Sequence, residues 1–146
     1  MTDAVANVIT LLFTNWTKAN TDDIKPLFLD ITTIKQTDVL NNDYVLVYEV
    51  DLDDSSFGIG GKDFATEVII TADIRTTFLK KDMELARGHA IKMRDEIRRI
   101  VRAKIENPDS DFKLIQVRRI KDLSNKNIGI GRFAVDLVLQ QWGEPP

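Results

Sequence analysis

The segment 55–64, SSFGIGGKDF, is the first candidate for chemistry because it places a Gly-Lys pair among glycines. A phosphate-binding loop has the spacing G-x-x-x-x-G-K-[ST], in which backbone amides surround the phosphates and a hydroxyl reaches Mg²⁺. Here Ser56 stands where the first glycine belongs, and Asp63 stands where the hydroxyl belongs. The residues that follow alternate like a strand, whereas a bound phosphate needs the N-terminus of a helix. The segment therefore does not match a phosphate site.

Two further candidates are the acidic run DLDDSS at 51–56 and the single histidine, His89. The acidic run could offer oxygens to Ca²⁺, but an EF-hand loop has glycine where Ser56 stands and glutamate where Lys62 stands. His89 lies inside a predicted helix, in a chain with no cysteine and no G-x-S-x-G motif. A lone histidine cannot anchor a zinc site, and no orienting partner is evident. We therefore expect His89 at the surface or the core boundary, and we expect no catalytic residue, metal ligand or cofactor.

Arginines are concentrated on one face of the helix predicted after residue 82. With about 100° of rotation per residue, four of them lie within about 80° of one another: Arg87, Arg94, Arg98 and Arg102. They could form bidentate pairs with carboxylates of a neighbouring subunit, bind nucleic-acid phosphates, or keep the helix solvated. No aromatic residues alternate with them, which argues against stacking on single strands. We favour subunit contact and keep the other two interpretations as alternatives.

Two other segments complete the predicted interface. Arg118 and Arg119 would contribute if the edge of their predicted strand is exposed. Phe57 lies between serines and glycines without a core partner in the sequence, and aromatic residues dominate interface hot spots. We expect its loop to reach an adjacent subunit, or the structure that the assembled subunits bind, through Phe57, Gly58, Gly60 and Gly61. The aromatic residues near the two ends of the chain, Trp16 and Trp142, are better explained as core.

Charge is divided along the chain. Residues 1–74 carry 4 basic and 13 acidic side chains, a net charge of −9, whereas residues 75–121 carry 14 basic and 7 acidic side chains, a net charge of +7. Complementary potentials of this kind favour head-to-tail association of copies. The alternative is that the acidic and the basic side chains lie on separate surfaces that are exposed to solvent. A basic segment inside an acidic protein indicates nucleic-acid binding less strongly than a basic domain would.

The composition fits one domain, 1–146, that can bury a core without disulfides. No apolar run approaches the roughly 20 residues that a bilayer span needs, and the N-terminus lacks the basic opening of a signal peptide. We expect a soluble protein made in the cytoplasm.

Residue periodicity predicts the first elements. A helix over 3–18 ends before Pro26, and strands at 27–36 and 43–52 follow it, joined by a hairpin turn at 41–43. The face of the second strand that we expect in the core consists of Tyr44, Leu46, Tyr48, Val50 and Leu52.

A long strand over 66–79 follows the glycine-rich loop, and we expect it to project as part of a hairpin arm. The residues that we expect to face inward are Val68, Ile70, Ala72, Ile74 and Phe78. Asp82 is the predicted N-cap of the next helix, which Asn107 and Pro108 end. The apolar stripe of that helix is Met83, Ala86, Ala90, Met93, Ile97, Val101 and Ile105.

Two closing strands, at 111–120 and 131–142, complete the order α-β-β-β-α-β-β. This order predicts an α+β fold, a mostly antiparallel sheet with two helices packed on one side and an extended hairpin loop.

The layout resembles that of the tail terminator, or tail completion, proteins of tailed viruses such as bacteriophages. It is carried by the N-terminal helix that ends in a tryptophan, the strand ATEVIITADIRTTF, the helix ELARGHAIKMRDEIRRIV, and the closing pair FKLIQVRRI and GRFAVDLVLQQW. The resemblance implies a small α+β protein without enzymatic activity that forms a ring, commonly of six subunits.

Such a ring caps the tail tube, stops its polymerisation and joins the tail to the head connector. The partners implied are further copies of the chain, the tail tube protein and a connector or neck protein, within a virion tail assembled in the host cytoplasm. The genome would pass through the ring without specific contact, and no membrane is implied. The alternatives are another neck or head-tail joining protein, a nucleic-acid-binding module that uses the basic helix, and an enzyme for which the sequence offers no constellation of residues.

Overall fold

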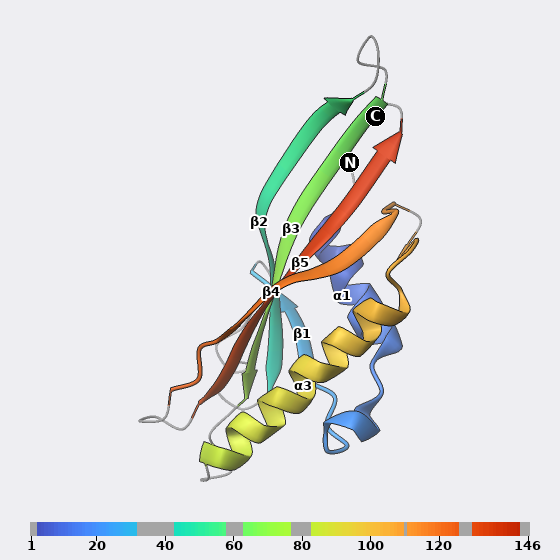
Figure 1. The fold of residues 1–146 in the computed structure, drawn as a ribbon. Helices are drawn as coiled ribbons and strands as arrows, with labels where there is room; N and C mark the ends of the chain where they lie inside the picture. Colours follow the sequence, from blue (N-terminus) through green and yellow to red (C-terminus); the bar gives the residue numbers. More distant parts are fainter. Residues whose placement is uncertain are drawn as a thin grey trace.

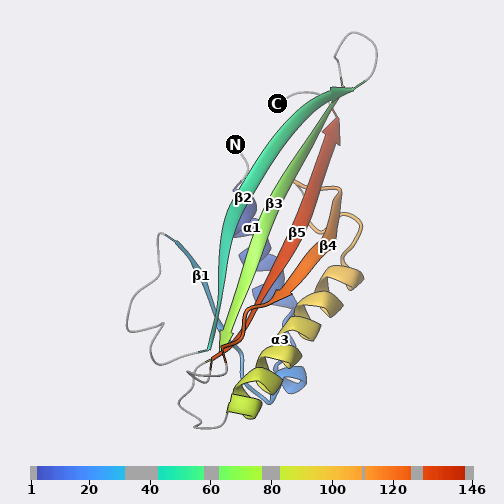
Figure 2. The same ribbon diagram turned by 60° about the vertical axis from the view of Figure 1, so that its left-hand side comes forward.

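A five-stranded sheet with both long helices against one face makes up the fold (Figures 1 and 2). The computed structural model describes residues 3–31, 43–57, 63–76, 83–109, 111–125 and 130–143. The elements are α1 (Ala4–Asn15), the short 3₁₀ helix η1 (Lys18–Thr21), β1 (Leu27–Asp30), β2 (Tyr44–Phe57), β3 (Asp63–Thr76), α3 (Met83–Ala103), β4 (Leu114–Asp122) and β5 (Gly131–Gly143). The predicted α+β class, element order and mostly antiparallel sheet are confirmed.

The strands lie in the order β1-β2-β3-β5-β4, and all neighbours are antiparallel except β1 and β2. β1 runs parallel to β2, with Leu27 opposite Tyr44 and Asp30 opposite Val47. A two-residue hairpin cannot join parallel strands, since the chain must return to the same end of the sheet. The predicted antiparallel hairpin between these two strands is therefore wrong, because local turn chemistry does not report the direction of pairing. Residues 41 and 42 of the predicted turn lie outside the described residues.

The core face of β3 was predicted correctly, but that of β2 was not. Among the described residues of β3, those predicted to face inward are buried: Val68, Ile70, Ala72 and Ile74; Phe78 lies outside the described residues. In β2, Val45 and Val47 are fully buried opposite Ile74 and Ala72. Val50 and Leu52, which we expected in the core, are 58% and 47% exposed.

A β-bulge explains part of the error in β2. The register shifts between Glu49 and Asp51, so the strand changes which residues face the helices. Before the bulge Tyr44, Leu46 and Tyr48 lie on the face away from the helices, where Tyr44 is nevertheless buried. A period-2 pattern cannot locate a bulge in a strand whose two faces both contain apolar residues.

Both helices bury the residues that their spacing predicts. Asp3 caps α1 by accepting from the Ala6 amide, and the helix buries Ala4, Val8, Leu11 and Leu12. In α3 the described stripe is buried at Ala86, Ala90, Met93, Ile97 and Val101. Ile105 is an exception, 41% exposed, because α3 ends at Ala103. The predicted cap Asp82 and the side chain of Met83 lie outside the described residues.

Trp16, directly after α1, is buried as expected. Its ring packs edge-on to Phe28 of β1, and its Nε1 donates to Thr21 Oγ1 at 3.1 Å. The side chain of Trp142 lies outside the described residues, although its backbone pairs with Ala65.

Three strands extend beyond the helices as an arm (Figures 1 and 2). β2 pairs with β3 from Tyr44 opposite Arg75 to Phe57 opposite Asp63. β5 pairs with β3 over the same length, as far as Phe64 opposite Gly143. The long β2–β3 hairpin was expected, and β5 supports it as a third strand.

A buried carboxylate, Glu96, ties α3 to the segment after α1. Its oxygens accept from the Thr17 amide, from Asn20 Nδ2 at 3.1 Å and from Arg99 Nε at 2.6 Å. Burial alone would raise the pKa of Glu96, but these hydrogen bonds lower it overall. The interaction thus fixes α3 relative to α1 and η1.

We expect Glu96→Gln to lower the free energy of unfolding by about 1–3 kcal/mol at pH 7, because an amide cannot accept at both positions. The folded-state pKa of Glu96 is below its unfolded value, so this stabilisation is complete above the unfolded pKa and is lost as pH falls through the folded one. The difference between the two proteins should therefore shrink in acid. Urea unfolding followed by tryptophan fluorescence at neutral and acidic pH measures it.

The matched control is Glu106→Gln, since Glu106 is exposed. Its free energy of unfolding at pH 7 should lie within about 0.5 kcal/mol of that of the wild type. An equally harmless Glu96→Gln would contradict the role of Glu96.

Candidate subunit interface

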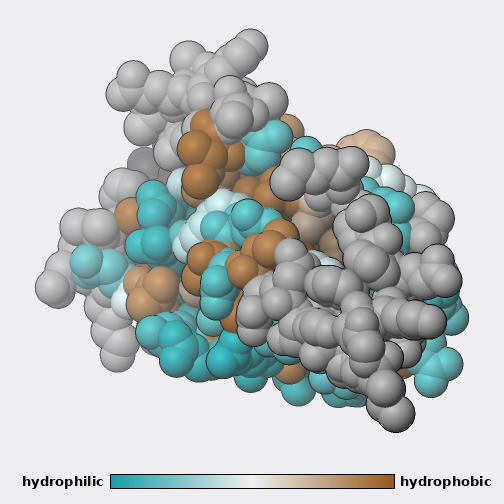
Figure 3. All heavy atoms as spheres, turned by 90° about the horizontal axis from the view of Figure 1, so that it is seen from above, coloured by the Kyte–Doolittle hydropathy of each residue, from teal (hydrophilic) through white to brown (hydrophobic). Residues whose placement is uncertain are grey.

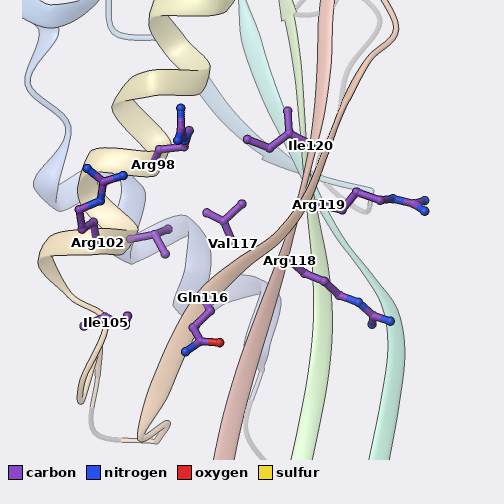
Figure 4. A pocket seen from close by; sticks show the side chains of 9 residues that line it. Arg98, Arg102, Ile105, Gln116, Val117, Arg118, Arg119 and Ile120 are labelled. Carbon is purple, nitrogen blue, oxygen red and sulfur yellow. The ribbon is translucent and has the colours of Figure 1, made fainter.

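A groove of about 520 Å³ lies between α3 and the edge strand β4 (Figure 4). One wall consists of α3 together with Ile105, which lies just after the helix ends, and the other wall consists of β4. The lining residues are Arg98, Val101, Arg102, Ile105, Gln116, Val117, Arg118, Arg119 and Ile120. Four of the six arginines predicted for an interface therefore lie at one place.

A β-bulge in β4 arranges the charged and apolar groups of this groove. The register with β5 shifts between Val117 and Arg119, so that Arg118 is the extra residue. Val117 and Ile120 consequently both point toward α3, although they are three positions apart, whereas Arg118 and Arg119 point away from it (Figure 4). The groove has an apolar floor with guanidinium groups on both faces of the sheet edge.

Among the described residues, the positive charge of the groove has few partners. Arg98 lies 3.7 Å from Asp95, and Arg119 lies 3.7 Å from Asp136, at distances too long for strong hydrogen bonds. Within the described part of the chain, the exposed side chains of Arg102 and Arg118 form no ion pair or hydrogen bond. The groove therefore presents cations to whatever approaches the β4 edge.

Arg87 and Arg94, which we predicted for the same interface, are held within the molecule. Arg87 Nη2 donates to Asp122 Oδ2 at 2.8 Å. Burial would raise the pKa of Asp122, but hydrogen bonds from Ser124 and Arg87 lower it to about 2. The Cζ atom of Arg94 lies 5.0 Å from the ring centroid of Phe133, and its guanidinium donates to the adjacent Asp95. The predicted arginine face of α3 thus divides into two parts. Arg87 and Arg94 contact groups of the same chain, whereas Arg98 and Arg102 line the groove.

Acidic side chains lie along β2, toward the edge of the sheet opposite β4. β1 covers β2 only as far as Val47, and no described strand pairs with β2 on that side beyond this point. Glu49, Val50, Asp51 and Leu52 are all exposed there. Next to this edge is a hollow of about 220 Å³, lined by Asp3, Val5, Asp30, Ile31, Val47, Tyr48 and Glu49.

The two edges are separated by the full sheet, because β3 and β5 lie between β2 and β4. Figure 3 shows that, viewed from above, the described surface at the arm end has several separate apolar patches among hydrophilic groups. The two strand edges therefore differ from each other in charge. On the surface visible in Figure 3, no single continuous apolar patch distinguishes one from the other.

The glycine-rich part of the predicted interface stays a prediction. Phe57 ends β2 opposite Asp63, and its side chain lies outside the described part. Gly58, Gly60 and Gly61 also lie outside the described residues.

We expected His89 at the surface or the core boundary, but its side chain is buried, with 6% exposed. Its Nδ1 lies 2.9 Å from Asp22 Oδ2, and its Nε2 lies 2.9 Å from Asp43 Oδ2. The hydrogen bond from Lys92, followed by that from His89, lowers the pKa of Asp22. Both partners come from segments more than 40 positions away, so no local pattern in the sequence could indicate them. The cluster joins α3 to the turn after η1 and to the start of β2.

Neither a metal-ligand cluster nor a membrane-spanning helix occurs among the described residues. No group of three or more acidic, histidine or cysteine side chains there could hold a metal ion. No described helix combines the length and the apolarity that crossing a membrane requires.

Comparison with known proteins adds no assignment: no protein-family model matches the chain, and no curated protein matches its sequence.

We expect His89→Ala to lower the free energy of unfolding by about 1–3 kcal/mol, because it removes the group that bridges two carboxylates. Thermal and urea unfolding measure the change. The control is Lys92→Ala, which removes an exposed partner of Asp22 and should cost at most about 0.5 kcal/mol. If His89→Ala is no more damaging than this control, the bridge does not hold α3 in place.

Proposed function

We propose that the chain is a structural, non-enzymatic subunit of a ring that caps the tail tube of a tailed virus. The ring stops polymerisation of the tube and joins the tail to the head connector. The α+β layout resembles that of tail terminator proteins, and six subunits is the number that this resemblance implies.

The observation that carries the proposal is the opposite charge of the two sheet edges. The groove at the β4 edge presents Arg102 of α3 and Arg118 of β4, and the β2 edge presents Glu49 and Asp51. Because these surfaces differ, contact between copies is head-to-tail. Such a contact closes into a ring when its rotation divides a full turn, and otherwise it forms a filament.

A closed ring has two different faces, and this difference supplies the capping mechanism. One face matches the end of the tube, while the other lacks the surface that a further tube subunit needs. Growth therefore ends when the ring binds, and the second face is left for a connector.

The purified protein is expected to form rings with a central hole in negative-stain images, with a light-scattering mass several times that of one chain. Because charge drives the contact, rings should weaken as salt is raised. When the tube protein of the same virus assembles with the ring present, tubes should be shorter and closed at one end.

A strict monomer at low salt and high concentration would contradict the ring. Rings that leave tube length unchanged would contradict the capping role and favour another neck or head-tail joining function.

Nucleic-acid binding is a second candidate function, favoured by the arginines without intramolecular partners in the described residues, Arg102 and Arg118. Phosphate contacts release counterions, so affinity for DNA would fall steeply with salt, with a log-log slope of about −0.9 per phosphate contacted. A filter-binding titration over salt concentration tests this. The ring proposal predicts no binding at physiological salt, and tight binding with a steep slope would favour the second function.

A further inference from the structure

The acidic edge of β2 presents different groups on the two faces of the sheet. Directly opposite residues in an antiparallel pair share a face. Glu49 and Leu52 are paired with Ile70 and Val68, which are buried under the helices, so both lie on the helix-covered face. Asp51 is paired with Ile69 and lies on the opposite face. The edge thus combines an acid and an apolar group on one face with an acid on the other.

The β4 edge has the complementary arrangement. On the helix-covered face, the groove offers the apolar pair Val117 and Ile120 beside Arg98 and Arg102 of α3. On the opposite face, Arg119 is paired with Asp136, and Arg118 and Arg119 both point away from α3 (Figure 4). Cations are therefore available on both faces of the β4 edge. An apolar floor is present only on the face toward α3.

The backbone of β4 is also open to another strand. The Ile115 amide donates to the Ile105 carbonyl at 3.0 Å, which closes the start of the edge. Over 116–120 no described segment pairs with the outer side of β4. An unpaired strand edge of this kind accepts an additional strand from a partner.

We propose, resting on the ring proposed above, that residues 49–52 of one copy add as a strand to the 116–120 edge of the next copy. With the helix-covered faces aligned, Leu52 packs on the apolar floor and Glu49 meets Arg98 and Arg102. Asp51 meets Arg118 and Arg119 on the opposite face. The occupant is a second copy because its β2 edge matches the groove in charge on both faces and in apolar character on one.

The test is a charge swap between two variants. One carries Arg102→Glu with Arg118→Glu, and the other carries Glu49→Arg with Asp51→Arg; all four side chains are exposed. Each variant alone should associate at least about tenfold more weakly per reversed pair, by sedimentation or light scattering. An equimolar mixture should recover assembly, because each reversed groove then meets a reversed strand and each native groove meets a native strand.

The matched control is Lys18→Glu with Lys113→Glu, which changes charge equally at exposed cations that do not line the groove. It should assemble like the wild type. If wild-type rings form and both swap variants form them equally well, or if the mixture stays dispersed, the strand-addition contact is wrong while the ring stands. If the wild type itself is monomeric, the proposed function fails as well.

Circular dichroism establishes that each variant is folded. If a charge reversal prevents folding, the milder pair Arg102→Gln with Arg118→Gln replaces it. This pair should weaken assembly by at least about tenfold, and unchanged assembly would overturn the proposal.

Discussion

Two strand edges without a pairing strand among the described residues, β2 beyond Val47 and β4 over 116–120, are the feature on which the proposed assembly depends. Exposed edges associate with any other edge unless charge, bulges or cover prevents it. Here the edge at β2 is acidic and the edge at β4 is basic, and each contains a β-bulge. In our proposal, like edges repel each other while unlike edges attract, so the charges that oppose random association also select a head-to-tail contact. In our proposal, assembly is thus encoded in the same residues that keep the free subunit from aggregating.

The basic edge requires a fixed α3, because the groove exists only where this helix lies beside β4. Apolar packing holds the helix on the sheet, and two buried polar clusters fix its position along it. Glu96 binds the chain directly after α1, and His89 bridges to the turn after η1 and to the start of β2. Buried polar groups are costly unless they are satisfied, so these contacts favour one placement of α3 over sliding alternatives.

Sequence periodicity was sufficient for the fold class, for the apolar stripe of α3 and for the inward residues of β3, since each depends on one element with a regular repeat. It failed where the outcome depended on pairing between elements. The parallel direction of β1, the bulge near Val50 and the carboxylate partners of His89 are all set by segments distant in the sequence. The arginine face was recognised from helical spacing. Its division could not be foreseen, because Asp122 of the sheet binds Arg87 and the Phe133 ring packs against Arg94.

The most direct test of the central claim is proximity between the two edges in the assembled protein. The chain has no cysteine, so Leu52→Cys and Gln116→Cys variants each carry a single thiol, one on each edge. We predict that a short bismaleimide links the two variants into a covalent heterodimer when they are mixed, and links neither variant efficiently to itself. Homodimers formed through position 52 alone, or no cross-link in assemblies that form normally, would contradict the head-to-tail contact.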